Sequence, residues 1–273
     1  MRILITGGSG YLGKALTKRW RDEHTVCIYS RSEITQAQLE EHPNVRKFIG
    51  DVRDQQRLRR AMVGCDVVIH AAALKRIEVG RYNPDEMVKT NVLGTINVIE
   101  AAQDSEVDRV VYVSSDKAWQ PISAYGLSKA IGEALTLAAN DMVRYRRPRF
   151  SVTRYGNVMG STGSVIPTWR AAIAKGETIK VTDPDATRFW MSIDEACDLI
   201  DKAVTVMQGG ERFIPRLPAF RLGDLAEATN GFGCEVIGLP AWEKLHEGMD
   251  DDNRSDTAPR MTLDDIRERL ADV

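Results

Sequence analysis

The sequence is poor in the features that mark proteins of oxidising compartments and membranes. Its 273 residues include only four cysteines, Cys27, Cys65, Cys197 and Cys234, and they form no CxxC pair. Such spacing argues against a disulfide framework and a structural zinc site, so we expect small buried thiols and no metal. No apolar run reaches membrane-spanning length, and the chain opens with a strand-like segment instead of a secretory signal. The sequence therefore predicts a reduced cytoplasmic protein with no membrane partner.

The sequence also lacks an excess of charge of either sign. Lys and Arg number 37 and Asp and Glu number 39, which gives a net charge of −2. A nucleic-acid-binding surface usually brings a basic excess, so we expect no nucleic-acid partner. Hydrophobic residues make up 43% of the chain, and its length suits one large α/β unit or a nucleotide domain with a smaller lobe.

Short apolar runs alternate along the chain with amphipathic stretches. The predicted strands are Ile3–Thr6, Thr25–Tyr29, Val45–Ile49, Val67–His70, Val110–Ser114 and Phe150–Arg154. The predicted helices between them are Leu12–Trp20, Gln55–Met62, Asn91–Ala102 and Tyr125–Ala139. Buried strands alternating with helices are typical of a parallel sheet covered on both faces. The pattern predicts an α/β protein with a Rossmann-like, doubly wound parallel sheet.

The pattern changes after Tyr155, where Gly, Pro and short runs dominate. We therefore predict a dinucleotide-binding domain over residues 1–155 and a smaller C-terminal substrate lobe over residues 156–273. A helix pattern follows at Ile193–Met207, and a last one at Leu263–Leu270. Two alternatives stay open for residues 193–207, which belong to the lobe or return to pack on the Rossmann sheet.

A glycine-rich turn joins the first strand to the first helix. It reads Thr6-Gly7-Gly8-Ser9-Gly10-Tyr11-Leu12-Gly13, and its glycines have the spacing GxxGxxG. Glycines tighten the turn and let the backbone approach a pyrophosphate, while the helix N-terminus offers unpaired N–H groups. Gly7, Gly10, Tyr11, Leu12 and Gly13 are therefore candidate cofactor residues.

The end of the second strand distinguishes between two cofactors. An NAD site usually places Asp or Glu there for the ribose hydroxyl, whereas this strand ends in Ser30 and Arg31. A guanidinium suits a phosphate by charge and geometry. We therefore predict NADP as the cofactor, with Ser30 and Arg31 near its phosphate.

The next two predicted strands end in residues that fit the same cofactor. Asp51 and Val52 follow the third strand, where an aspartate can meet the adenine edge. Ala71, Ala72 and Ala73 follow the fourth strand, where small side chains leave room for the cofactor.

A group of reactive side chains lies at the end of the fifth predicted strand and in the helix after it. Ser115, Asp116 and Lys117 end the strand, and Tyr125 and Lys129 lie one turn apart on the helix. A lysine ammonium near a phenol lowers the phenol pKa, so Tyr125 can take a proton from an alcohol while a hydride leaves it. Asp116 and Lys117 add a second acid/base set that a plain dehydrogenase does not need.

With these motifs together, the chain resembles the inverting UDP-N-acetylglucosamine 4,6-dehydratases of the extended short-chain dehydrogenase/reductase superfamily. The resemblance runs nearly from end to end. It is carried by Ser30-Arg31-Ser32-Glu33, Ala72-Ala73-Leu74-Lys75, Tyr82-Asn83-Pro84, Lys89-Thr90-Asn91-Val92, Ser115-Asp116-Lys117-Ala118, Arg154-Tyr155-Gly156-Asn157-Val158, Gly160-Ser161, Gly163-Ser164-Val165, Thr187-Arg188-Phe189-Trp190 and Glu243-Lys244-Leu245-His246-Glu247.

The resemblance implies an activity and a role for each catalytic residue. A UDP-N-acetylhexosamine-like substrate becomes a 4-keto-6-deoxy sugar by oxidation at carbon 4, loss of water and hydride return to carbon 6. Tyr125 takes the 4-hydroxyl proton, and Lys129 holds the nicotinamide ribose and tunes Tyr125. Lys117 takes the carbon 5 proton, Asp116 assists the leaving 6-hydroxyl, and Ser115 supplies the hydroxyl of the usual triad. Lys117 must be neutral for this role, which requires a lowered pKa.

The resemblance also implies binding residues and an assembly. Asn91 lies near the cofactor, while the substrate contacts are Lys75, Asn157, Ser164, Val165 and Arg188. Arg188 is expected to pair with the substrate diphosphate. A tightly bound NADP and a homo-oligomer are further expectations.

Three departures fall where the family makes substrate and subunit contacts. Thr162 replaces an arginine of the family pattern, and Leu239-Pro240-Ala241-Trp242 lacks a second one. The stretch after Met249 is shortened.

Other functions stay open at this point. A nucleotide-sugar 4-epimerase or 5,6-dehydratase would share the step of Tyr125 and Lys129, although an epimerase needs no Asp116-Lys117 pair. A non-catalytic NADP-binding regulatory protein is an alternative of another class, against which the intact Ser115, Tyr125 and Lys129 argue.

Overall fold

The protein is built around one large parallel sheet. A computed structural model describes residues 1–143, 147–161, 163–230 and 233–271. The sheet has seven strands in the order β10-β6-β5-β4-β1-β2-β3. In chain order these strands are β1 (Arg2–Thr6), β2 (Thr25–Ser30), β3 (Val45–Ile49), β4 (Val67–His70), β5 (Arg109–Val113), β6 (Arg149–Thr153) and β10 (Arg212–Phe213). The order reverses between β1 and β4, which is the doubly wound Rossmann-like arrangement that the sequence predicted.

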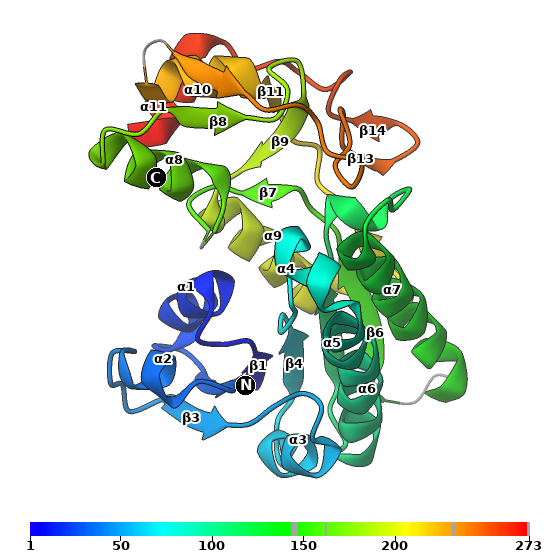
Figure 1. Cartoon of the computed structure of the whole chain (residues 1–273). Coiled ribbons are helices and arrows are strands. Elements are labelled where there is room, and N and C mark those ends of the chain that lie inside the picture. Colours follow the sequence, from blue (N-terminus) through cyan, green and yellow to red (C-terminus); the bar gives the residue numbers. More distant parts are fainter. Residues whose placement is uncertain (144–146, 162, 231–232, 272–273) are drawn as a thin grey trace.

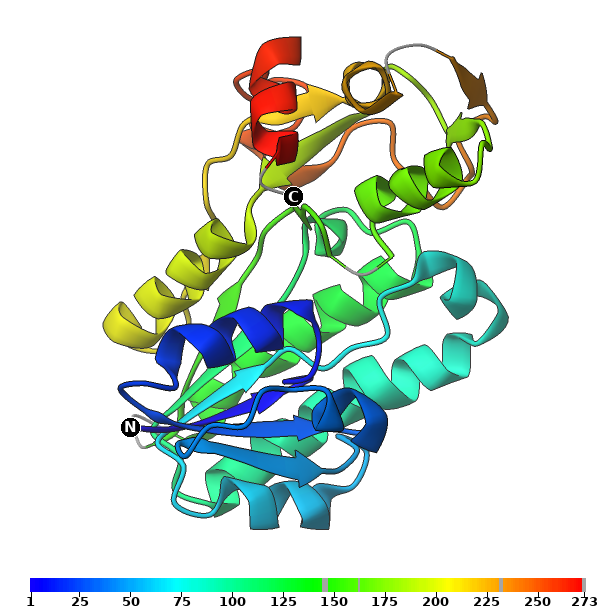
Figure 2. The ribbon, with the colours of Figure 1, turned by 90° about the vertical axis from the view of Figure 1, so that its left-hand side faces the viewer.

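Helices cover both faces of this sheet because successive strand residues point to opposite sides. On one face, Ile3 and Ile5 of β1 share a core with Leu16 and Ile200. These two come from α1 (Tyr11–Trp20) and α9 (Ile193–Val206). On the other face, Leu4 packs into a core with the remaining large helices. These are α3 (Gln55–Met62), α6 (Gly94–Asp104) and α7 (Ala124–Val143), and Figure 2 shows the two layers on either side of the strands.

The region before α6 differs from the predicted helix Asn91–Ala102. A π-helix, η1 (Val88–Leu93), precedes α6 directly. The other short helices are α2 (Glu33–Ala37), α4 (Ile77–Tyr82), α5 (Pro84–Met87), which contacts η1, and the 3-10 helix η2 (Asp116–Ala118). The π-helix contains Asn91, so the predicted cofactor residue lies in a widened turn.

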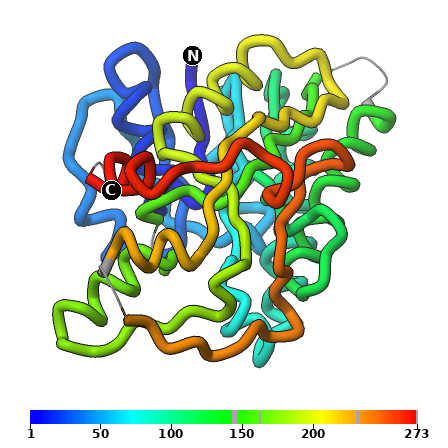
Figure 3. Tube along the Cα trace, turned by 90° about the horizontal axis from the view of Figure 1, so that it is seen from above, coloured from blue at the N-terminus to red at the C-terminus, as the bar shows by residue number. Residues whose placement is uncertain are grey.

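A smaller lobe lies beyond the carboxyl ends of the large sheet (Figure 1). Trp190 and Phe220 pack edge to face in its separate core. Its elements are β7 (Asn157–Val158), α8 (Val165–Ala174), β8 (Ile179–Val181), β9 (Thr187–Met191), β11 (Ala219–Arg221), α10 (Leu222–Asn230), β12 (Cys234–Val236), β13 (Gly248–Asp250), β14 (Asn253–Arg254) and α11 (Leu263–Ala271). Seen from above, this lobe spreads over the end of the sheet (Figure 3).

The chain returns from the smaller lobe to the large sheet once. Helix α9 packs on β5 and β6 and beside α1, and β10 then pairs with β6 in parallel. Ser192 and Glu195 start α9 with a reciprocal capping box. Residues 193–213 therefore belong to the large sheet by their contacts, and a domain boundary at residue 155 stays a prediction.

Three of the cysteines, Cys27, Cys65 and Cys197, are buried as expected, whereas Cys234 is half-buried. Across the described part of the chain, no helix combines the length and apolar character needed to cross a bilayer.

Candidate active site

The glycine turn lies at the reversal point of the sheet and leaves no room for side chains. Gly7 has a φ of +71°, and a Cβ on it would lie 3.0 Å from the Ala72 backbone. A Cβ on Gly13 would lie 2.5 Å from the Gly8 backbone, which fixes α1 close to the turn. Gly10, the N-cap residue of α1, has no side chain that could accept a hydrogen bond from the start of the helix. The first N–H groups of α1, at Tyr11 and Leu12, can therefore donate to a ligand. This cradle can accept a phosphate group.

The end of β2 carries the predicted phosphate-binding pair. Ser30 is buried and its hydroxyl accepts a hydrogen bond of 2.8 Å from Gln36. Arg31 is half-exposed, and its guanidinium lies 3.9 Å from the Asp51 carboxylate. Asp51 is itself held by Arg53 at 2.7 Å. The two predicted residues are adjacent, but only Arg31 reaches the surface.

The ends of β3 and β4 border the same turn. Val52 is buried in the core rather than open to a ligand. Ala71, Ala72 and Ala73 are partly exposed, and the Ala72 N–H donates to Thr6 Oγ1 at 3.2 Å.

Asn91 holds the loop after β4 onto the catalytic helix. Its Oδ1 accepts from the Leu74 N–H at 2.8 Å, and its Nδ2 donates to Leu74 O and to Ser128 Oγ, each at 2.9 Å. Ser128 in turn donates to Tyr125 O at 2.7 Å. Asn91 therefore positions the helix that carries Tyr125, and it is buried away from solvent.

A buried histidine extends this network to the glycine turn, and sequence reasoning did not identify it. His70 Nδ1 lies 2.8 Å from Thr6 Oγ1, and Nε2 lies 3.0 Å from Thr95 Oγ1. The Thr95 hydroxyl donates to Asn91 O, so it can only accept from His70 Nε2. The Nε2–H tautomer of His70 therefore satisfies the contacts of both ring nitrogens, with Nδ1 accepting from Thr6. Burial lowers the pKa of His70 to about 3, which keeps the ring neutral.

The catalytic turn begins where β5 ends. Ser115 Oγ donates to Asp116 Oδ1 at 2.8 Å, and Asp116 Oδ2 is buried without a hydrogen-bond partner in the described residues. Burial raises the pKa of Asp116, and the Glu247 charge adds to that rise. An aspartic acid in this state can donate a proton.

Lys117 Nζ has three oxygen neighbours. They are Asp116 Oδ1 at 3.2 Å, Asn157 Oδ1 at 3.3 Å and Glu247 Oε1 at 3.4 Å. Burial opposes the ammonium form, but Asp116 and Glu247 outweigh it and raise the pKa of Lys117. The lowered pKa that the sequence-based role required is therefore absent from this structure, because two carboxylates surround the amine.

Tyr125 and Lys129 lie one turn apart on α7, as predicted. Burial raises the pKa of Tyr125, while the Lys117 charge and a Ser115 hydrogen bond oppose the rise. Lys129 donates to Val113 O at 2.5 Å, and burial lowers its own pKa to about 7. The cation that acts on the pKa of Tyr125 here is Lys117, and the role expected of Lys129 stays a prediction.

Arg188 of β9 also faces the catalytic turn. It is buried, and its Nη2 donates to Glu243 Oε1 at 2.6 Å while Nη1 donates to Leu245 O at 3.0 Å. The positive charge of Arg188 lowers the pKa of Glu247 and opposes the rise in the pKa of Lys117. Arg188 therefore lies beside Lys117 and Glu247 with Glu243 as its carboxylate partner, and its pairing with a substrate diphosphate stays a prediction.

The other predicted substrate residues lie apart from this group. Lys75 is exposed in the loop after β4, and Ser164 and Val165 begin α8. Among the described residues, no hydrogen bond or ion pair joins these three to the catalytic side chains. Thr162 lies outside the described residues. Trp242, a departure from the family pattern, stacks under Arg81 of α4, 3.5 Å from ring centroid to guanidinium carbon.

Two buried acidic residues belong to the site although neither was assigned a role from the sequence. Glu247 lies beside Lys117, and Glu133, two turns beyond Tyr125, pairs with Arg154. The spacing of four residues from Lys129 to Glu133 on one helix was the sequence signal for Glu133. Glu247 lies far from the other site residues in sequence and gave no such signal.

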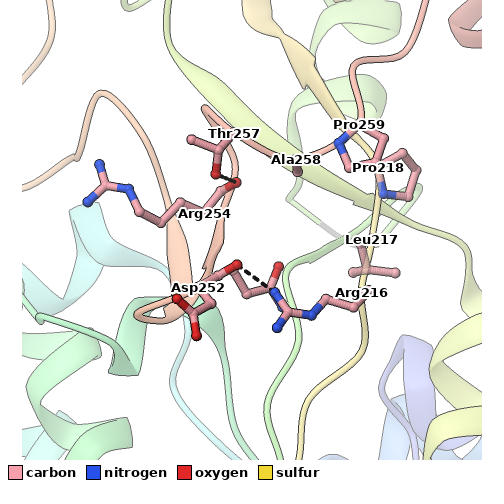
Figure 4. A pocket seen from close by; sticks show the side chains of 9 residues that line it. Arg216, Leu217, Pro218, Asp252, Arg254, Thr257, Ala258 and Pro259 are labelled. Atoms are coloured by element: carbon pink, nitrogen blue, oxygen red, sulfur yellow. Dashed lines mark hydrogen bonds between the residues drawn. The ribbon is translucent and has the colours of Figure 1, made fainter.

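A separate hollow lies in the smaller lobe, where no predicted site residue lines it. It has a volume of about 310 Å³ and is bordered by Arg216, Pro218, Asp252 and Arg254. Figure 4 shows Arg216 donating to the Asp252 carbonyl, at 2.6 Å, across it.

Comparisons with known proteins agree with this geometry. The family model described as "Polysaccharide biosynthesis protein" matches residues 3–265. A protein of Campylobacter jejuni named UDP-N-acetylglucosamine 4,6-dehydratase (inverting) is 43% identical over 255 residues, covering 90% of this chain and 76% of its own. A Rickettsia bellii protein named UDP-glucose 4-epimerase is 40% identical over 261 residues, with the same coverages of 90% and 76%. The X-ray structure of Pen from Bacillus thuringiensis has a TM-score of 0.95 at 33% identity, covering 99% of this chain and 97% of that one.

Proposed function

The chain belongs to the polysaccharide biosynthesis protein family, within the extended short-chain dehydrogenases/reductases, and from this membership we propose that it is an NADP-dependent nucleotide-sugar 4,6-dehydratase. The substrate is a UDP-N-acetylhexosamine, and the product is its 4-keto-6-deoxy derivative. One observation carries the proposal: Asp116, which is buried, and Lys117, which is partly buried, form a second acid/base pair beside Ser115 and Tyr125. Simple oxidation of an alcohol needs no such pair, whereas elimination of water needs an acid and a base.

The residues around the glycine turn fit a dinucleotide. A side chain at Gly7 or Gly13 would fill the cradle, and the N-terminus of α1 faces the same space. When bound, the cofactor accepts a hydride from carbon 4 and returns it to carbon 6. The half-exposed Arg31 guanidinium favours NADP over NAD because it can pair with a ribose phosphate.

The substitution Arg31→Ala tests this cofactor choice. It should weaken binding of NADP by about tenfold or more and leave NAD binding nearly unchanged, since only NADP carries the additional phosphate. Isothermal titration of both cofactors measures the two affinities. Tighter binding of NAD than of NADP by the unaltered protein contradicts the choice.

The chain's own residues can move every proton that the reaction requires. Tyr125 takes the 4-hydroxyl proton, and the resulting ketone acidifies the proton on carbon 5. Lys117 takes that proton in its neutral form, and Asp116 gives its proton to the departing 6-hydroxyl, which leaves as water. Asp116 must then regain a proton. Tyr125 holds the proton from the 4-hydroxyl and can return it to Asp116 through the Ser115 hydroxyl, which lies between them. Lys117 finally returns a proton to carbon 5.

Isotope labelling tests the activity. A UDP-N-acetylglucosamine deuterated at carbon 4 should give a product lighter by one water that carries the deuterium at carbon 6. In heavy water, solvent deuterium should appear at carbon 5. Tyr125→Phe should stop both reactions, and Lys117→Ala should stop elimination. Mass spectrometry and NMR of the product measure these outcomes.

An epimerase is the second candidate, because the Rickettsia bellii relative carries that name. An epimerase would keep the label at carbon 4 and give a product with the mass of the substrate. That result would overturn the dehydratase proposal.

We further propose that the partner in solution is a second copy of the chain. Val88, Leu93, Leu127 and Ile131 each expose about half of their apolar side chains. Val88 and Leu93 lie on η1, and Leu127 and Ile131 lie on α7, and these two elements pack against one another. An exposed apolar group on adjacent helices is typical of a protein interface.

A further inference from the structure

We propose that Glu247 of the smaller lobe is a positioning residue that takes the proton of Lys117 and later returns it. Lys117 can act as a base only after it has lost a proton, and Glu247 provides a buried acceptor beside it. The inference rests on the proposed dehydration and adds a residue to it.

The contacts of Lys117 show why it needs such an acceptor. An ammonium has three N–H donors, and Lys117 Nζ has three oxygen neighbours, from Asp116, Asn157 and Glu247. Asn157 is an amide and holds no additional proton at its oxygen. Asp116 is already the proposed donor to the leaving hydroxyl, so its proton is committed. Glu247 Oε1, 3.4 Å from Nζ, is the remaining carboxylate.

Glu247 is held rigidly enough for this task. Its backbone N–H donates to Ser255 Oγ at 2.9 Å, and Ser255 donates to Thr187 O at 3.1 Å. Lys244 lies 3.5 Å from its second oxygen, Oε2, and donates to the Trp119 carbonyl next to the catalytic turn. Oε2 is buried and has no hydrogen-bond partner in the described part of the chain. The oxygen that can take a proton from Lys117 is Oε1, while Oε2 faces Lys244.

The surrounding charges hold the resting state as an ion pair. Lys117 faces Asp116, Glu247, Arg188 and Tyr125, whereas Glu247 faces Lys117, Arg188 and Lys244. Burial opposes ionisation of Glu247, but the three cations outweigh it and lower its pKa. Arg188 acts on both partners, because its charge supports the Glu247 carboxylate and opposes the Lys117 ammonium.

The transfer is balanced. An N–H bond of Lys117 breaks and an O–H bond of Glu247 forms, which gives a neutral amine and a carboxylic acid. The amine takes the carbon 5 proton and gives one back to carbon 5 after the hydroxyl has left. Glu247 then returns its proton to Lys117, and the resting ion pair forms again without any external acid or base.

Glu247→Gln tests the inference by separating the two chemical steps. At neutral pH, solvent deuterium exchange at carbon 5 should fall about 10²-fold. Oxidation at carbon 4, followed by the absorbance of reduced nicotinamide in a single turnover, should persist because Tyr125 and Lys129 are intact. Exchange should recover as the pH rises, because external base then removes the ammonium proton. Glu247→Asp keeps a carboxylate and should retain more exchange than Glu247→Gln.

Controls make each outcome decisive. Glu235→Gln, the same change at an exposed ion pair of the same lobe, should leave exchange unchanged. Unaltered or faster exchange in Glu247→Gln overturns the inference, because loss of the carboxylate also lowers the pKa of Lys117 and favours its neutral form. Equal loss in Glu247→Gln and Glu247→Asp also overturns it, because the residue would then act only through packing. If the unaltered protein shows no exchange at carbon 5, the dehydratase proposal fails instead.

Discussion

At the scale of single residues, Arg188 is placed to respond to the charge of a bound substrate. Its guanidinium is paired with Glu243 at 2.6 Å, so a diphosphate must displace that carboxylate to bind. Glu243→Gln should therefore lower the Kd of a UDP-sugar, by about tenfold at most, whereas Arg188→Ala should raise it by about 10- to 100-fold. Calorimetric titration measures both. If Glu243→Gln weakens binding as Arg188→Ala does, Glu243 orients Arg188 instead of competing for it.

Lys129 predicts a pH dependence of cofactor binding. Burial lowers the pKa of Lys129 to about 7, so its amine loses its charge as the pH rises through that value. An anionic cofactor favours the ammonium, so binding above pH 7 must be accompanied by proton uptake. The Kd of NADP should then rise with pH, at most about tenfold per pH unit. Lys129→Met should abolish the pH dependence of the Kd. Lys129→Arg should also abolish this pH dependence, but it keeps the positive charge at the site.

The proximity of the candidate site residues could be predicted from the sequence, but the shifts of their pKa values could not. Ser115, Asp116, Lys117 and Tyr125 follow one strand and start one helix, so their proximity follows from the local chain. Glu247 reaches Lys117 only through tertiary folding, and its carboxylate reverses the expected change in the pKa of Lys117.

At the scale of elements, a buried ion pair fixes the catalytic helix α7 to the sheet. Glu133 of α7 accepts from Arg154, which follows β6, and from Arg212 of β10 at 2.9 Å. Removal of one partner leaves a buried charge, so Glu133→Gln should lower the free energy of unfolding by on the order of 3 kcal/mol.

Urea denaturation measures this loss against two references. Glu235→Gln at the exposed pair with Lys180 should change stability by less than about 0.5 kcal/mol. Replacing both buried partners, by Glu133→Leu with Arg154→Met, should recover part of the loss. A double variant less stable than the single one would show that the ion pair is not the source.

The elements that were predicted and those that were missed differ in length and burial. β3 and β4 match their predicted ranges; β4 is a buried, mainly apolar run, whereas β3 contains two charged residues between apolar ones. The strands of the smaller lobe, such as β7 and β14, have only two residues and form through pairing with distant segments. Residues 91–93, the start of the predicted helix Asn91–Ala102, lie in the π-helix η1, and side-chain periodicity does not distinguish its widened turn from an ordinary helical turn.

At the scale of the whole molecule, the exposed apolar group on η1 and α7 predicts a dimer. Leu127→Glu combined with Ile131→Glu should place two charges in the interface and give a monomer. Analytical ultracentrifugation over a range of concentrations measures this. Glu235→Gln serves as a surface control. A monomeric unaltered protein, or a dimer unaffected by the double substitution, contradicts the proposed partner.

The return of the chain through α9 and β10 has a consequence for cooperativity. The smaller lobe is not a terminal module, because it consists of two excursions, residues 156–191 and 214–271, that both leave from strands of the large sheet. One excursion carries Asn157 and the other Glu247, and Lys117 touches both. No single cut in the chain can release the lobe intact. The lobe and the sheet should therefore melt in one calorimetric transition, and a protein truncated after residue 155 should fail to fold.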